Sequence, residues 1–177
     1  MKVEFIVHSI PGSPYGRAVF AVLEEKGAGY RLAPVDGQNR HNEPHISRHP
    51  FGRIPVIEHD GFMLYETQAI LRDIDRALPE PALTPVGAKA AARLDQVMNI
   101  CAWYLFPGVN NVIGFQRIIK PKLMGLPPDE DVIAQAMPKA HAVFNALARL
   151  LGDNDYLTGT AVTLADLMVP PHLDFMS

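Results

Sequence analysis

Two hydroxyl side chains lie close together in the segment Ser13-Pro14-Tyr15-Gly16, which separates an apolar strand-forming run from a helix-forming run. A serine followed by a proline is typical of a helix N-cap and the first helical position. The segment has the layout of a Cys-Pro-Tyr-Cys redox motif in which serine and glycine replace both cysteines. A hydroxyl can polarise the sulfur of another molecule but cannot form a disulfide. The segment therefore predicts a site that binds a thiol, and its simpler interpretation is a helix cap.

A second polar pair, Glu66-Thr67, occupies the predicted start of another helix. Unpaired backbone N–H groups at such a position can bind a carboxylate, and a nearby acid can pair with an ammonium group. The alternative is again structural, because Thr67 can cap its own helix while Glu66 favours the dipole of the first turn. The pair is suited to a ligand that carries both charges.

Three histidines, His41, His45 and His49, recur at every fourth residue and would share one face of an unbroken helix, as metal ligands can. Pro44 would then have to fall in the first turn of that helix, and no acidic or thiol ligands accompany the rings. A chance cluster is the favoured interpretation, and no metal is expected. Serine hydrolase chemistry is not indicated either, because Ser13 lacks a Gly-x-Ser-x-Gly elbow.

Strands and helices alternate in the first half of the chain. A helix is predicted from about Pro14 to Lys26, and another starts near Thr67. Strand-forming runs lie at residues 3–7, 30–35, 54–58 and 62–65, and Asp60-Gly61 between the last two is a hairpin signal. This order predicts a four-stranded mixed sheet with helices packed on it.

The second half of the chain is helical throughout. Pro79, Pro81 and Pro85 mark the change, so we expect an N-terminal domain at residues 1–78, a linker at 79–85 and an all-helical domain at 86–177. The fold class is α+β. Thr163 with Asp166 predicts a capping box that starts the last helix. Two earlier helical stripes comprise Leu94, Val97, Met98, Cys101 and Leu105, and then Ala136, Ala140, Val143, Phe144, Leu147, Leu150 and Leu151.

Composition excludes several classes of partner. The 177 residues include 16 basic and 19 acidic side chains, a net charge of -3, and no dense basic run, so nucleic acid is not an expected partner. The single cysteine, Cys101, fits a reducing compartment, and no secretory signal is evident, so we expect a cytoplasmic protein. The uncharged stretch from Gln96 to Gln116 contains too many polar residues for a membrane span.

Four motifs, in their order and spacing, resemble the cytosolic glutathione S-transferase family, and most of all its phi class and bacterial relatives. The family's fold is a thioredoxin-like domain followed by an all-helical one. The resemblance implies an enzyme that conjugates the thiolate of glutathione to an apolar electrophile and works as a homodimer. Family members usually have a longer helical domain, so we expect either a truncated form or a partner in place of the missing tail. The motifs are Ser13-Pro14-Tyr15-Gly16-Arg17, Pro50-Phe51-Gly52-Arg53-Ile54-Pro55, Tyr65-Glu66-Thr67 and Thr163-Leu164-Ala165-Asp166.

The resemblance also implies a role for each site residue. Ser13 would donate a hydrogen bond to the glutathione sulfur, with Tyr15 as a rival donor and Ser9 as a weaker one. A cis Ile54-Pro55 bond would present backbone to the cysteinyl part. Glu66 and Thr67 would bind the γ-glutamyl end, and Arg40, His41 and Arg53 would face the glycyl carboxylate.

An electrophile pocket is the least specific of these expectations. Trp103, Tyr104, Phe106 and Phe115 could line it, although aromatic side chains at such positions are also typical of a plain core. Two alternatives to a transferase stay open: a non-catalytic binding or regulatory relative, and a glutathione-dependent isomerase or dehalogenase.

Overall fold

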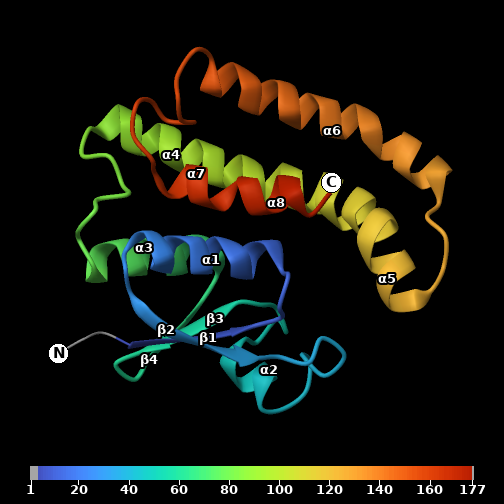
Figure 1. Ribbon diagram of the computed structural model, residues 1–177, viewed down its shortest axis with the longest axis horizontal. Helices are drawn as coiled ribbons and strands as arrows, with labels where there is room; N and C mark the ends of the chain where they lie inside the picture. The colour runs from blue at the N-terminus through green and yellow to red at the C-terminus, as the bar shows by residue number, and fades with distance from the viewer. Residues whose placement is uncertain (1–3, 177) are drawn as a thin grey trace. The chain divides into compact units, whose positions relative to one another are not determined.

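The computed structural model describes residues 4–176, and the chain divides into two compact units, Met1–Thr84 and Pro85–Ser177. Among the described residues, the first unit contains four strands and three helices, whereas the elements of the second unit are all helices (Figure 1). The predicted α+β fold, a mixed sheet followed by helices, is confirmed.

The sheet of the first unit has the order β2-β1-β3-β4. Strand β1 (Glu4–Ser9) pairs in parallel with β2 (Gly29–Pro34) and antiparallel with β3 (Val56–His59), which forms a hairpin with β4 (Phe62–Tyr65). In the register of β1, Val7 lies opposite Leu32 on one side and Ile57 on the other. The parallel pair is joined by a crossover helix, as parallel strands require.

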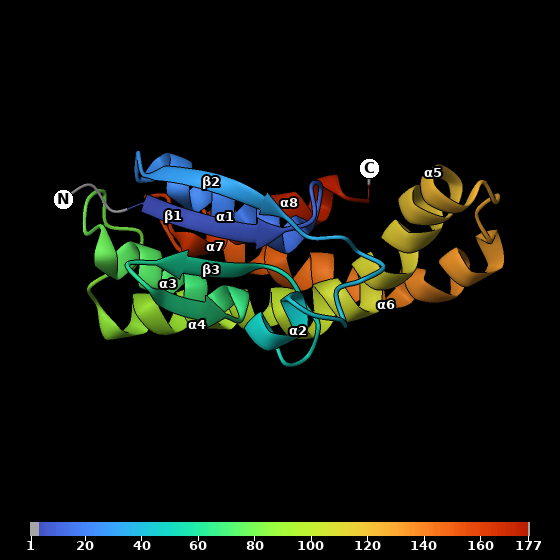
Figure 2. The same cartoon turned by 90° about the horizontal axis from the view of Figure 1, so that it is seen from below.

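Helices α1 (Pro14–Glu25) and α3 (Thr67–Ala77) cover one face of this sheet, and the short helix α2 (His45–Arg48) lies on the opposite side (Figures 1 and 2). Alternation along the strands sends every second side chain to the covered face. The core there combines strand and helix residues that are fully buried: Phe5, Val7, Val19, Val22, Ile57, Ile70 and Ile74.

A buried ion pair joins the ends of α1 and α3. Lys26, directly after α1, donates from Nζ to Oδ1 of Asp75 at 2.6 Å and to the carbonyl of Pro81. The same carboxylate accepts the backbone N–H of Leu83 at 2.9 Å. The proline-rich segment that follows α3 is therefore attached to the first unit through charged and polar contacts.

The second unit begins with α4 (Ala88–Ile100), which continues into the π-helical segment η1 (Cys101–Ile119) and the short helix α5 (Lys120–Met124). Pro107 lies inside η1, where it cannot donate the backbone hydrogen bond that a regular α-helix needs. The long helix α6 (Glu130–Leu151) follows. Both predicted apolar stripes lie on these helices, and Leu94, Val97, Met98, Cys101 and Leu105 are fully buried.

The expected single helix after Thr163 is two short ones, α7 (Leu164–Met168) and α8 (Pro170–Asp174). The predicted capping box is present, since the carboxylate of Asp166 accepts the backbone N–H of Thr163 at 2.9 Å. Pro170 stands at the first position of α8, a place where its missing N–H costs nothing. In the part of the chain that the structure describes, no helix has the length and apolar character to cross a membrane.

Candidate functional site

The N-terminus of α1 places Ser13 as the sequence predicts. Ser13 is the N-cap, and its Oγ accepts the backbone N–H of Gly16 at 3.4 Å. Its side chain is half-buried. A hydroxyl that accepts through a lone pair still has its own hydrogen to donate. Capping the helix and donating to a bound sulfur are therefore compatible functions of the same atom.

The two rival hydroxyls are placed differently. Ser9 ends β1, is fully buried, and its Oγ is so close to α1 that a Cβ on Gly16 would lie 2.2 Å from it. Glycine at position 16 is thus needed for the strand and helix to approach, and Ser9 is shut off from a ligand. Tyr15 is half-buried in the first turn of α1.

Glu66 is, with Asp60, one of two non-glycine residues that have a positive φ in the part of the chain that the structure describes. It is the N-cap of α3 with φ 71 and ψ 110, and its side chain makes no capping hydrogen bond. A residue with a side chain in such a conformation stores about 1–3 kcal/mol of strain, which the surrounding structure must hold. The carboxylate is exposed, while Thr67 beside it is buried at the start of the helix. The backbone of Glu66 thus places an exposed acid at the start of α3, where the first N–H groups have no partner within the helix.

The turn that leads into β3 carries the other predicted residues. The Ile54–Pro55 peptide bond is cis, Pro55 is buried, and Arg53 is exposed. The ring of His41 lies against this turn, since a Cβ on Gly52 would be 2.2 Å from its Nδ1. Arg40 extends elsewhere, donating to the carbonyl of Gly37 at 3.2 Å. The structure thus places the ring of His41 against Gly52, the neighbour of Arg53, whereas the side chain of Arg40, on the same exposed loop as His41, is directed to Gly37.

Two residues that the sequence analysis set aside as part of a chance cluster contact the same turn. His45 Nε2 bonds the carbonyl of Arg53 at 2.7 Å, and His49 accepts the N–H of Phe51 at 3.4 Å. Burial lowers the pKa of His49; the carboxylate of Glu66 opposes this, and His45 and Arg53 add to it. The sequence signal for these two residues is the recurrence of histidine at every fourth position, ending directly before Pro50. Among residues 4–176, no group of three or more His, Cys, Asp or Glu side chains is arranged to hold a metal.

The predicted pocket aromatics all lie in η1 and differ in exposure. Trp103 is 72% exposed and Tyr104 and Phe115 are exposed too, whereas Phe106 is half-buried with its ring centroid 6.0 Å from that of His172. Cys101 is buried in this segment, which raises the pKa of its thiol to about 12 and makes it a poor nucleophile at neutral pH.

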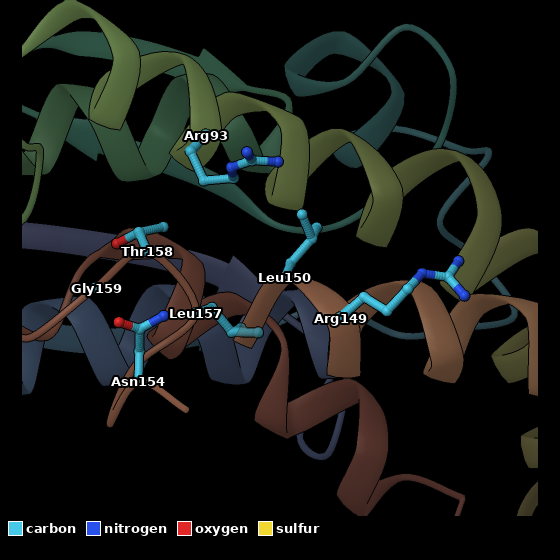
Figure 3. Close-up of a pocket in the computed structure, with 7 residues that line it drawn as sticks. All are labelled: Arg93, Arg149, Leu150, Asn154, Leu157, Thr158 and Gly159. Atoms are coloured by element: carbon cyan, nitrogen blue, oxygen red, sulfur yellow. The ribbon is translucent and has the colours of Figure 1, made fainter. Parts of the chain in front are cut away.

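The second unit contains a hollow with a lining of its own (Figure 3). It is formed by α4, the end of α6 and the loop after it, and its lining is mostly polar. None of the four predicted aromatic side chains contributes to it. Its lining residues are Arg93, Arg149, Leu150, Asn154, Leu157, Thr158 and Gly159.

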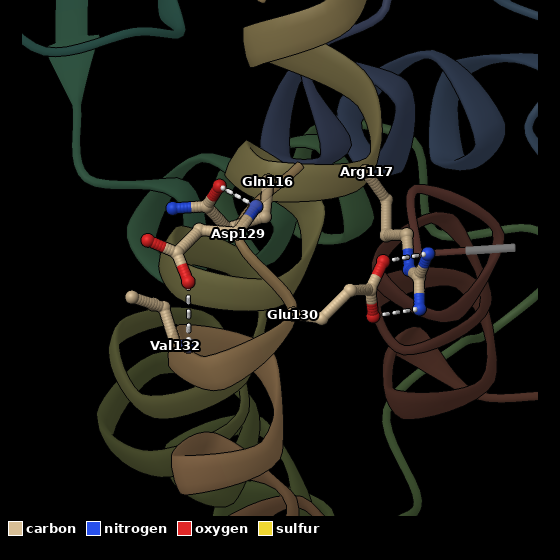
Figure 4. Close-up of polar contacts among 5 residues, drawn as sticks. All are labelled: Gln116, Arg117, Asp129, Glu130 and Val132. Carbon is tan, nitrogen blue, oxygen red and sulfur yellow. Dashed lines mark hydrogen bonds and ion pairs between the residues drawn. The ribbon is translucent and has the colours of Figure 1, made fainter. Parts of the chain in front are cut away.

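The end of η1 is fixed to the start of α6 by polar contacts (Figure 4). Arg117 forms a two-point ion pair with Glu130, at 2.8 and 3.0 Å, and Gln116 Oε1 accepts the backbone N–H of Asp129 at 2.9 Å. Asp129 in turn caps α6 by accepting the N–H of Val132. These bonds hold the stretch that includes Phe115 in a defined orientation.

Comparison with known proteins gives one consistent result. Residues 7–82 match the family model for the glutathione S-transferase N-terminal domain, and residues 98–177 match that for the C-terminal domain. The chain is 32% identical over 149 residues to a probable glutathione S-transferase from Oryza sativa subsp. japonica, covering 83% of this chain and 69% of the relative.

Solved structures agree with this similarity. Glutathione transferase F7 from Populus trichocarpa superimposes with a TM-score of 0.84 at 27% identity, over 97% of this chain and 82% of that one. A structure of glutathione S-transferase-I bound with the ligand lactoylglutathione superimposes with a TM-score of 0.81 at 25% identity, over 97% and 80% of the two chains.

Proposed function

The chain belongs to the glutathione S-transferase family, and from that premise we propose that it conjugates the thiolate of glutathione to an apolar electrophile, with Ser13 stabilising the thiolate. The observation that carries the proposal is the position of the Ser13 hydroxyl, which caps α1 and keeps its hydrogen for a ligand. The plant relatives support the expected likeness to the phi class.

The chemistry needed from Ser13 is modest. A free thiol has a pKa of about 8.5, and each unit by which a site lowers it requires about 1.4 kcal/mol of preferential stabilisation of the anion. A charge-assisted hydrogen bond and the positive end of α1 together can supply about two units. A bound thiol would then be mostly ionised at neutral pH, and proximity to the electrophile would supply the rest of the rate enhancement.

In this proposal the other residues bind the tripeptide. The exposed carboxylate of Glu66 pairs with the γ-glutamyl ammonium, and the N–H groups at the start of α3 bind its carboxylate. The backbone beside cis-Pro55 binds the cysteinyl part, and Arg53 with His41 faces the glycyl carboxylate. The relative that is bound with lactoylglutathione supports a ligand of this class.

The proposal also includes an apolar electrophile site, a homodimer and a cytoplasmic location. Exposed aromatic side chains on η1, among them Trp103 and Tyr104, offer the apolar surface that such a co-substrate needs. Size-exclusion chromatography of the purified protein tests the dimer directly.

Retention on immobilised glutathione, followed by a conjugation assay with an aryl halide, tests the proposed activity. We expect the protein to be retained and to turn over, and the Ser13→Ala variant to be retained with a much lower kcat. Retention without turnover, unchanged by Ser13→Ala, would favour a non-catalytic binding protein instead.

A further inference from the structure

Two buried histidines lie behind the turn that the proposed function assigns to glutathione. His45 is 4% exposed and His49 is 2% exposed, and their ring centroids are 6.4 Å apart. Both rings are thus almost closed to solvent. Each one bonds the backbone of the turn from His49 to Arg53, at a different point.

His45 holds the end of the turn. Its Nε2 lies 2.7 Å from the carbonyl oxygen of Arg53, and because a carbonyl only accepts, Nε2 carries the hydrogen. That carbonyl immediately precedes the Ile54–Pro55 bond, which enters β3. The hydrogen bond from His45 therefore fixes the Arg53–Ile54 peptide unit. The side chain of Arg53 and the backbone proposed to bind the cysteinyl part both adjoin this unit.

His49 holds the start of the turn and links it to α3. Its Nδ1 accepts the N–H of Phe51 at 3.4 Å, and its own carbonyl accepts the N–H of Gly52 at 2.8 Å. Its ring lies against Tyr65, with centroids 4.7 Å apart. Tyr65 is the residue before Glu66, so one imidazole packs between the two segments proposed to bind opposite ends of glutathione.

We propose that His45 and His49 are positioning residues for glutathione: they hold the turn of residues 49–53 against the strained start of α3, and His49 does so as a neutral ring whose Nδ1 is free to accept. This inference rests on the proposed function, and it names residues that set the affinity of the protein for glutathione. It also gives a role to the histidine spacing at 45 and 49, which needs no metal.

Protonation of His49 would undo its contact. A hydrogen on Nδ1 removes the acceptor for Phe51, and the new charge would face His45 and Arg53, which repel it, and Glu66, which attracts it. A Glu66 carboxylate drawn toward the ring is less available to the ligand ammonium. Affinity for glutathione should therefore fall as the pH drops through the range in which His49 takes up a proton.

Matched substitutions separate positioning from packing. His49→Asn keeps an acceptor near the place of Nδ1 and cannot titrate, whereas His49→Phe keeps the ring and loses the acceptor. His45→Gln keeps a donor near the place of Nε2, and His45→Phe loses it. We expect each phenylalanine variant to raise the KM for glutathione about five-fold, with little change in kcat, because each loses one hydrogen bond. The two amide variants should stay within about two-fold of the unmodified protein.

The pH profile gives a second measurement, which a purely structural role would not change. Because burial lowers the pKa of His49, the KM for glutathione in the unmodified protein should rise only at pH values below the ordinary histidine value of about 6.5, and this rise should be weaker in His49→Asn. His141→Asn, on the exposed surface of α6, is the control and should match the unmodified protein.

The outcomes distinguish the two proposals. An unmodified protein that does not bind glutathione would overturn the proposed function together with this inference. A protein that binds glutathione, with the same KM in both phenylalanine variants and the same pH profile in His49→Asn, would overturn only the positioning role. If the phenylalanine variants do not fold, the asparagine and glutamine variants and the pH comparison decide the matter.

Discussion

At the scale of single residues, the site depends on side chains whose structural and chemical functions coincide. Ser13 caps α1 through a 3.4 Å bond and still has a hydrogen to donate. Glu66 caps α3 by its backbone alone, in a strained conformation, and leaves its carboxylate free. At Ser13 the functional hydroxyl also stabilises the fold, whereas at Glu66 the position of the functional carboxylate lowers the stability of the fold.

A pair of substitutions at Glu66 tests the second arrangement. Glu66→Ala keeps the strained φ and removes the carboxylate, whereas Glu66→Gly removes both, because glycine adopts positive φ without strain. Both variants should lose affinity for glutathione, by about ten-fold if one ion pair of about 1.4 kcal/mol is lost. Denaturant unfolding should find Glu66→Gly more stable than Glu66→Ala by about 1 kcal/mol. Equal stability of the two variants would show that the residue is not strained.

At the scale of elements, the buried pair of Lys26 and Asp75 ties two helices to the segment after them. Burial raises the pKa of Asp75, but hydrogen bonds from Lys26, Thr84 and the backbone of Leu83 outweigh it, so the pKa is lowered overall. A carboxylate whose pKa is lowered by folding stabilises the fold at pH values above its pKa in the unfolded chain. This contribution is lost as the pH falls toward the pKa in the folded protein. At neutral pH the pair is therefore a charged joint inside an apolar unit.

A double-mutant cycle measures this joint. Lys26→Met leaves a buried carboxylate without its cation, and Asp75→Asn leaves a buried ammonium, so each should lower the free energy of unfolding by about 3 kcal/mol or more. The double variant should lose clearly less than the sum, because it contains no uncompensated charge. Additive losses in urea unfolding would mean that the two side chains do not act as a pair.

The elements also show how far sequence reasoning extends. The approximate positions of the four strands, the N-cap of α1 at Ser13 and the capping box at Thr163 follow from local propensity, so they could be predicted. The continuation of α4 through Pro107 could not, because tertiary packing overrides the local preference of proline to end a helix. The contacts of His45 and His49 could not be predicted either, because they depend on the path of the turn at residues 49–53, which is defined only in the folded chain. The positive φ of Glu66 likewise leaves no mark in a residue pattern.

At the scale of the whole molecule, buried neutral histidines make the fold sensitive to acid. His172 in α8 is fully buried, which lowers its pKa to about 4, and its Nδ1 donates to the carbonyl of Met168 at 2.9 Å. Its own carbonyl accepts from Asn110 of η1 at 2.6 Å. His172 therefore connects α8 to η1.

This burial predicts a loss of stability between pH 6.5 and about 4. In that range the unfolded chain binds a proton that the folded chain does not, so stability falls as the pH is lowered and is constant above about 6.5. The loss from His172 should reach about 3 kcal/mol at pH 4. Denaturant unfolding at a series of pH values measures it, and His172→Asn, which can still donate but cannot titrate, should flatten the curve. An equal slope in both proteins would assign the acid sensitivity to other groups.

The central claim is that the Ser13 hydroxyl stabilises the thiolate of bound glutathione. Ultraviolet difference absorbance of the thiolate, recorded against pH with glutathione bound to the unmodified protein, Ser13→Ala and Tyr15→Phe, tests it most directly. We expect a bound thiol pKa of about 6.5 in the unmodified protein and in Tyr15→Phe, and a value at least about one unit higher in Ser13→Ala with glutathione still bound. An unchanged thiol pKa in Ser13→Ala, or a rise only in Tyr15→Phe, would contradict the account.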